Sequence, residues 1–321
     1  MTGSELGTQQ SGEAQVRRYT VSTADGVGLA VEERGPVDAE YTVFLDHGLC
    51  LSQVSWDPQK KLLERQFGDQ VRTVSFDHRG HGRSDSAPMS TYTIEQLGRD
   101  HAAVVEAAGV RGLSTMVGHS MGAMALMEYL RLPARQRPVN PDGLVLVATA
   151  AGQLAERGLG RLLGLPLIGV VADVLAHTPH RGGDRAVRSL VRPVCRTVTR
   201  VCGLCEAERD TLTACMADAV YSTPLTTAVG FLPSLKRFDA RSVLPTIQAR
   251  TVVLSGGADV LTPVAHAREL AGAIPGATHR HIAAAGHMLL HEAPHAVTDA
   301  IGQAIAAESA RHGELIAGVA S

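Results

Sequence analysis

The stretch that decides the fold of this 321-residue chain reads LSTMVGHSMGAMALMEY and occupies residues 113–129. It opens as an apolar run of strand character and stops at Ser120, a serine held between Gly118 and Gly122. An Ala-, Met- and Leu-rich run follows, with no proline or glycine from Ala123 to Leu132. The pattern predicts a strand, a sharp turn and a helix.

The predicted turn indicates that Ser120 is a nucleophile. A serine in such a turn has a strained backbone, and the flanking glycines lack the side chains that would collide where strand and helix approach. The hydroxyl of Ser120 is therefore expected to be exposed and available as a nucleophile. The helix that begins beside it directs its amides and positive dipole end at the same point, which stabilises a developing oxyanion. The alternative is an ordinary tight turn.

Composition and charge describe a globular protein with a sizeable core. Hydrophobic residues make up 45% of the chain, and 30 lysines and arginines against 32 aspartates and glutamates give a net charge of −2. A chain so close to neutral has no overall field that would attract nucleic acid. The cysteine count of five is odd, and the polar start of the chain lacks the pattern of a secretory signal, so we expect a reducing, cytoplasmic setting.

Short β-rich runs that alternate with helical stretches predict an α/β fold with a mostly parallel, doubly wound sheet of about eight strands. The first two strands join at the turn 24–26 and are expected to form an antiparallel hairpin. In parallel sheets of this kind, ligands bind at the carboxyl ends of the strands. The predicted strands are 16–22, 27–33, 41–45, 71–76, one that begins at 113, 143–147, 251–255 and 278–283, and further predicted helices are 58–67, 94–108 and 296–307.

One interval is too long to be a crossover between two strands, because about a hundred residues separate residue 149 from residue 246. We therefore expect an inserted helical cap. Within it, residues 162–172 form an uncharged apolar run that is too short to span a bilayer. This run is expected either to pack over the core or to line an acyl-binding wall or touch a membrane surface. The predicted division is a disordered tail at 1–15, a core at 16–148 and 246–321, and the cap at 149–245.

A serine is a poor nucleophile unless a base takes its proton and an acid orients that base. Asp259 follows the predicted strand 251–255, and His287 follows the predicted strand 278–283. Both side chains are therefore expected at the carboxyl end of the sheet, where Ser120 also projects. We predict that Ser120, His287 and Asp259 act together as nucleophile, general base and orienting acid.

Several motifs together resemble the α/β-hydrolase fold family: DHGL at 46–49, DHRGHGRS at 77–84, GHSMG at 118–122, GGAD at 256–259, and GH at 286–287. The chain order of serine, aspartate and histidine is also the order expected in that family. The resemblance implies the same three catalytic residues and an oxyanion hole made by two backbone amides. One is the amide of Met121 at the helix start, and the other, implied by the resemblance alone, is that of Leu49.

Other acidic and histidine residues are weaker candidates for these roles. Asp142 precedes its strand and so lies at the wrong end of the sheet, and neither Asp85 nor Asp239 has the strand-then-loop setting. His291 lies four residues after His287 but is expected to cap a helix or face solvent. Three other motif histidines, His78, His81 and His119, are expected to be structural or to support the catalytic residues.

No cofactor or metal site is predicted. The sequence has no phosphate-binding loop, zinc-protease motif, EF-hand or dinucleotide fingerprint. Cys195, Cys202 and Cys205 follow helical spacing and are expected to pack inside the cap, since one CxxC pair is too little to close a zinc site. Cys50, next to the predicted oxyanion hole, is either a small buried residue or a target for thiol reagents.

These inferences predict a serine hydrolase that cleaves a carboxylic ester with a hydrophobic acyl or alcohol group through an acyl-enzyme, as an esterase or lipase does. The partner is then a small hydrophobic ester, and weak membrane contact through the cap is an option. Thioesterase, perhydrolase, amidase and carbon–carbon bond hydrolase activities use the same residues and stay open. The alternative from another class is a non-catalytic ligand-binding protein on the same scaffold.

Overall fold

The computed structural model describes residues 16–154, 156–157 and 223–305. The predicted tail at 1–15, the apolar run at 162–172 and the cysteines at 195, 202 and 205 lie outside these residues, and the cap boundaries stay predictions. Within the described part of the chain, no helix combines the length and the apolar character needed to cross a membrane.

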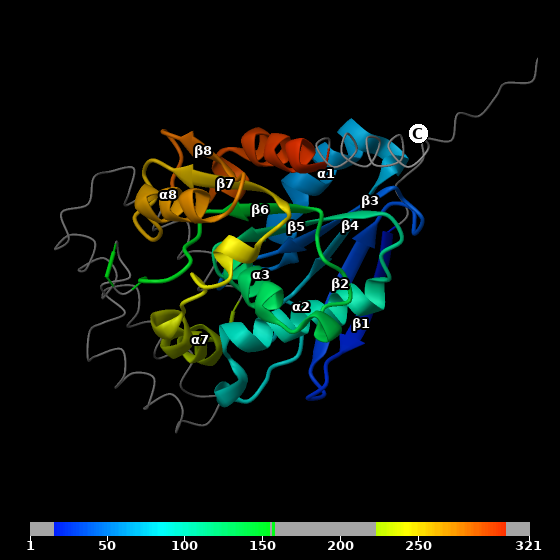
Figure 1. Ribbon diagram of the computed structural model, residues 1–321. Coiled ribbons are helices and arrows are strands. Elements are labelled where there is room, and N and C mark those ends of the chain that lie inside the picture. Colours follow the sequence, from blue (N-terminus) through cyan, green and yellow to red (C-terminus); the bar gives the residue numbers. More distant parts are fainter. Residues whose placement is uncertain (1–15, 155, 158–222, 306–321) are drawn as a thin grey trace, which may run out of the picture.

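Eight strands form one sheet in the order β1-β2-β4-β3-β5-β6-β7-β8, which confirms the predicted α/β architecture (Figure 1). The hairpin strands β1 and β2 are antiparallel to each other, and β2 is antiparallel to β4. From β4 through β3 to β8 every neighbouring pair is parallel. The strands are β1 Val16–Ser22, β2 Gly28–Arg34, β3 Tyr41–Asp46, β4 Val71–Phe76, β5 Leu113–His119, β6 Gly143–Val147, β7 Arg250–Gly256 and β8 Thr278–Ile282.

The chain changes direction across the sheet at β3. From β3 it passes to β4 on one side, and it then returns to β5 on the other side of β3. The loops that follow β3 and β5 therefore diverge at the carboxyl ends of two adjacent parallel strands. Such a switch point opens the crevice in which open α/β sheets bind their ligands.

Helices cover both faces of the sheet, and neighbouring residues of a strand point into different cores. In β3, Phe44 belongs to the core under α2 and α3, whereas Val43 and Leu45 belong to the core under α1 and the helix 294–305. Figure 1 shows these two helical layers below and above the sheet. The helices are α1 Asp57–Phe67, α2 Ile94–Ala108, α3 Met121–Arg131, α7 Leu225–Arg237, α8 Val264–Ala273, α9 Leu289–Glu292 and the segment 294–305.

Helix α8 is absent from the predicted elements. Its ten residues are few, and its apolar residues Ala267 and Leu270 form only one short buried stripe. Pro263 directly before it and Ile274 with Pro275 directly after it are the local signals that could have marked its two ends.

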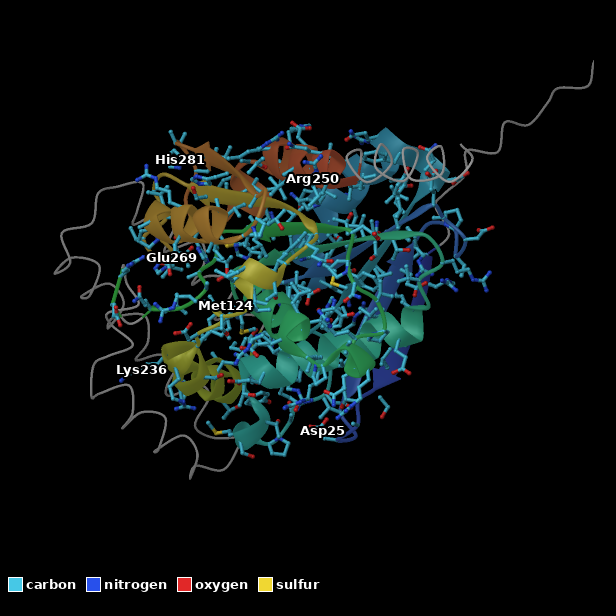
Figure 2. The ribbon with its side chains drawn as sticks, viewed as in Figure 1. Asp25, Met124, Lys236, Arg250, Glu269 and His281 are labelled. Atoms are coloured by element: carbon cyan, nitrogen blue, oxygen red, sulfur yellow. The ribbon has the colours of Figure 1, made fainter. Side chains whose placement is uncertain are left out.

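A buried ion cluster fixes the loop that follows β4. The guanidinium of Arg79 is fully buried and makes two hydrogen bonds to Asp100 of α2, at 2.6 and 2.7 Å, while Asp100 is itself fully buried. Arg79 also binds Asp25, whose side chain is 37% exposed. Asp25 lies at the turn between β1 and β2 (Figure 2). Hydrogen bonding to Arg79 lowers the pKa of Asp25 to about 2. One arginine thus joins the hairpin, the loop after β4 and α2.

We expect Arg79→Met to lower the free energy of unfolding by about 3–5 kcal/mol, because it leaves the Asp100 carboxylate buried without its cation. Asp25→Asn removes only the half-exposed ion pair with Arg79 and should lower the free energy of unfolding by no more than about 1 kcal/mol. Urea denaturation of the two variants measures the difference. An Arg79→Met protein as stable as Asp25→Asn would contradict this view of the cluster.

Candidate active site

The turn between β5 and α3 has the geometry predicted from the sequence. Ser120 connects the two elements with φ 51° and ψ −116°, a backbone conformation that residues other than glycine rarely adopt. A Cβ atom on Gly118 would lie 2.4 Å from the Cα of Ala123, and one on Gly122 would lie 2.3 Å from the carbonyl oxygen of Asp46. Neither position accepts a side chain, so the two glycines are what allows strand, turn and helix to approach.

Strand β6 holds the serine backbone from the side. The amide of Ser120 donates to the carbonyl oxygen of Val147 at 2.9 Å, which extends the pairing of β5 with β6 beyond the strand end. The hydroxyl of Thr149 donates to the carbonyl oxygen of Ser120, also at 2.9 Å. The N–H and C=O groups of Ser120 are thereby both held by hydrogen bonds, so the backbone that carries the hydroxyl is fixed.

The structure brings the three predicted residues together. The Nε2 atom of His287 lies 3.0 Å from the Oγ atom of Ser120, and its Nδ1 atom lies 2.9 Å from Oδ2 of Asp259. The three side chains follow β5, β7 and β8, so they meet at the carboxyl end of the sheet. His287 and Asp259 are buried at 5% and 4% exposure. The arrangement can pass a proton from a hydroxyl to an imidazole whose other nitrogen is held by a carboxylate.

The loop after β7 keeps Asp259 ionised and oriented. The amides of Leu261 and Thr262 each donate to Oδ1 of Asp259 at 2.9 Å, and the Thr262 hydroxyl donates to Oδ2 at 2.7 Å. Burial alone would raise the pKa of Asp259, but His287 and the Thr262 hydrogen bonds outweigh it and lower that pKa. The carboxylate is therefore available to accept the Nδ1–H of His287.

The loop after β3 lies against the serine. A Cβ atom on Gly48 would lie 3.3 Å from the Cβ of Ser120. The next residues form a turn closed by the Leu51 amide on the Gly48 carbonyl oxygen, with Cys50 at φ 62°. Among the described residues, the amides of Leu49 and Met121 have no hydrogen-bond acceptor. Both predicted oxyanion-hole donors are thus unpaired on segments that adjoin Ser120.

Buried histidines support this loop. His81 accepts a hydrogen bond from the Cys50 amide at its Nε2 atom, 3.1 Å away, and His47 accepts one from the His78 amide at 3.0 Å. The Nε2–H of His78 donates in turn to the carbonyl oxygen of His47. Burial lowers the pKa of all three rings, and that of His81 falls to about 3, so they act as neutral hydrogen-bonding groups. These contacts fit the structural role predicted for His78 and His81.

The contacts around the backbone of His287 are not evident from the sequence. The Nε2 atom of His119 lies 2.9 Å from the carbonyl oxygen of His287, across 168 residues of chain. The carboxylate of Glu292 accepts hydrogen bonds from the amides of Gly286 and Met288. The spacing of His287 and Glu292, five residues apart on the segment after the last strand, is the one local signal that could have suggested the second contact.

The weaker candidates lie elsewhere. Asp142 accepts a hydrogen bond from the Ser114 amide at the start of β5, the end of the strand away from Ser120, and Asp85 accepts one from the Gly28 amide. Asp239 pairs with Arg241 in solvent. His291 is exposed. None of these side chains contacts His287 within the described residues.

Two other site possibilities find no support in the described part of the chain. The Cys50 side chain is buried, and burial raises the pKa of its thiol to about 12, which disfavours the reactive thiolate. Among the same residues, no three histidine, cysteine or acidic side chains are grouped so that they could hold a metal ion.

Comparisons with known proteins agree with this geometry. A family model described as alpha/beta hydrolase fold matches residues 41–294. The chain is 35% identical to the non-heme chloroperoxidase of Streptomyces lividans over 129 residues, which are 40% of this chain and 44% of that protein. It is 23% identical to 3-oxoadipate enol-lactonase 1 of Acinetobacter baylyi over 257 residues, 78% of this chain and 83% of that protein.

Solved structures share the fold. A thermophilic esterase from Thermogutta terrifontis superposes with a TM-score of 0.68 at 24% identity, covering 91% of this chain and 99% of that one. The chain thus matches nearly the full length of this esterase but less than half the length of the chloroperoxidase.

Proposed function

The chain belongs to the α/β-hydrolase fold family, and we propose that it is a serine hydrolase that cleaves carboxylic esters through an acyl-enzyme. The observation that carries this proposal is the continuous hydrogen-bonded path from Ser120 through His287 to Asp259, at 3.0 and 2.9 Å. The hydroxyl, the imidazole and the carboxylate lie within hydrogen-bond reach of one another, as the proposed roles of nucleophile, base and orienting acid require.

In the proposed mechanism, Oγ of Ser120 attacks the ester carbonyl while Nε2 of His287 takes its proton. The Asp259 carboxylate, held by Thr262, keeps the proton of His287 on Nδ1 and stabilises the imidazolium that forms. The oxyanion that develops on the carbonyl oxygen is stabilised by the free amides of Leu49 and Met121. His287 then protonates the leaving alcohol, and a water molecule activated by the same ring releases the acid and restores Ser120.

We further propose that the substrate is a small ester with a hydrophobic acyl or alcohol part. Two of the similar proteins support an ester, because one is named an esterase and the other acts, by its name, on an enol-lactone, a cyclic ester. The hydrophobic preference rests on the uncharged run at 162–172, which is outside the described residues. Membrane contact through the cap and a cytoplasmic setting likewise rest on the sequence alone.

The name of the Streptomyces relative favours one second candidate, perhydrolysis. In that reaction hydrogen peroxide replaces water and attacks the carbonyl carbon of the acyl group on Ser120. The bond from that carbon to Oγ breaks, His287 passes the peroxide proton to Oγ, and the acyl group leaves as a peracid. The same serine, histidine and aspartate would carry both reactions, so the two are separated by the acceptor supplied and not by the residues. Peracid formation from an ester and hydrogen peroxide, compared with hydrolysis at equal substrate concentration, decides between them.

We expect Ser120→Ala to lower the turnover of p-nitrophenyl esters by several orders of magnitude and to abolish labelling by a fluorophosphonate, because the nucleophile is gone. Thermal unfolding should change little, since the backbone contacts of Ser120 remain. Ser114→Ala is the matched control, because Ser114 lies at the other end of β5 and its hydroxyl has no partner among the described residues. Turnover by Ser120→Ala within tenfold of the parent protein would overturn the assignment.

Asp259→Asn tests the acid. The amide leaves the shape of the site intact but favours the wrong tautomer of His287, so kcat should fall by a factor on the order of 10⁴. Asp142→Asn makes the same chemical change at the far end of the sheet and should keep kcat within about twofold, since it touches no site residue. Steady-state kinetics of both variants give the answer, and the reverse ranking would show that Asp259 is misassigned.

A series of p-nitrophenyl esters with increasing acyl length tests the hydrophobic preference. Each buried methylene contributes about 0.8 kcal/mol, so two more methylenes should raise kcat/KM roughly ten- to fifteenfold. Leu167→Asp or Ile168→Asp should then weaken long-chain turnover far more than acetate turnover, because only the apolar wall is charged. A flat profile across acyl lengths would contradict a hydrophobic acyl site in this stretch.

A further inference from the structure

Two side chains, those of His119 and Glu292, bind the backbone of the three consecutive residues 286–288. The amides of Gly286 and Met288 both donate to the carboxylate of Glu292, the second at 3.1 Å. Between them, the carbonyl oxygen of His287 lies 2.9 Å from Nε2 of His119. Glu292 therefore accepts hydrogen bonds from the amides on either side of His287, and His119 binds the carbonyl oxygen of His287 itself.

This loop needs such support because of where it lies in the fold. His287 follows β8, which is the edge strand and pairs with β7 alone. Its ring has to stay within hydrogen-bond reach of Ser120 on one side and Asp259 on the other. A shift of about 1 Å in such a group costs on the order of a hundredfold in rate. The two ring hydrogen bonds cannot secure that position if the backbone drifts.

The His119 ring is suited to the task because it has one tautomer and no charge. The carbonyl oxygen of His287 can only accept, so Nε2 of His119 carries the proton and donates it. Its Nδ1 atom is buried and has no hydrogen-bond partner among the described residues, and a Cβ atom on Gly48 would lie 2.8 Å from it. Burial and the nearby His287 lower the pKa of His119 to about 3, so a second cation does not form 5.0 Å from the His287 ring.

We propose that His119 and Glu292 are positioning residues that hold His287 between Ser120 and Asp259. The proposal rests on the proposed function, since it assigns these residues to the general base of that reaction. His119 directly precedes the nucleophile, so the same short segment fixes both Ser120 and, through one hydrogen bond, the backbone of its base. Neither side chain touches the reacting atoms, and their effect passes through the placement of the imidazole.

His119→Leu and His119→Gln form the first pair of variants. Leucine removes the donor to the His287 carbonyl, and we expect kcat to fall roughly ten- to hundredfold with KM within about twofold. Glutamine can place an N–H where Nε2 of histidine lies, and should bring kcat back to within about threefold of the parent. Equal losses in the two variants, or a leucine variant with unchanged kcat, would overturn the role of His119.

Glu292 provides a second test, because this residue is exposed and its replacement leaves the core intact. We expect Glu292→Ala to lower kcat roughly tenfold at constant KM, and Glu292→Gln to fall in between, because an amide has only one oxygen to accept from two backbone donors. Glu106→Ala, the same change at an exposed position of α2, is the control and should leave kcat unchanged. A Glu292→Ala protein that behaves like Glu106→Ala would overturn the role of Glu292.

A measurement that does not depend on turnover separates this proposal from the proposed function. The proton on Nδ1 of His287, hydrogen-bonded to Asp259 at 2.9 Å, should give a low-field resonance in the proton NMR spectrum of the parent protein. We expect that signal to broaden or vanish in His119→Leu and Glu292→Ala and to persist in His119→Gln and Ser120→Ala. An unchanged signal in the first two variants refutes the positioning role, whereas a parent protein that neither labels nor turns over esters refutes the function and leaves the NMR comparison valid.

Discussion

The close approach of α3 to β5 around Ser120 is the contact on which the rest of the site depends. The two glycines of the turn leave no space for a Cβ, and Gly122 lies directly against the carbonyl oxygen of Asp46 at the end of β3. The helix start and the loop after β3 are therefore pressed against the serine from two sides. The two segments that carry the predicted oxyanion amides are thus placed beside the serine by contact between backbones.

Much of this site could be predicted because its main residues carry local signals. Ser120, Asp259 and His287 each follow a β-rich run within a few residues, and the parallel sheet brings the carboxyl ends of those runs to one edge. The catalytic roles of the three residues, and of the amides at Leu49 and Met121, stay predictions until they are tested. What the fold supplies is their proximity, which topology alone is enough to anticipate.

The supporting contacts could not be predicted, because they depend on the orientation of side chains far apart in the sequence. The bond from His119 to the His287 carbonyl spans 168 residues, and the cluster of Arg79 with Asp25 and Asp100 joins three separate elements. A histidine looks the same in the sequence whether it acts as a catalytic base, as a metal ligand or as a buried hydrogen-bonding group. Contacts separate these roles here: burial lowers the pKa of His47, His78, His81 and His119, whereas His287, although also buried, is the histidine that lies between Ser120 and Asp259.

The order of the site along the chain also has a consequence for how the site is assembled. Ser120 lies on β5 in the middle of the sheet, whereas His287 follows β8, the strand at the sheet edge. A sheet in which β8 has not yet paired with β7 therefore holds Ser120 without the imidazole that we propose as its base. The proposed activity depends on that one edge pairing, and loss of β8 from the edge would switch it off while leaving Ser120 in place.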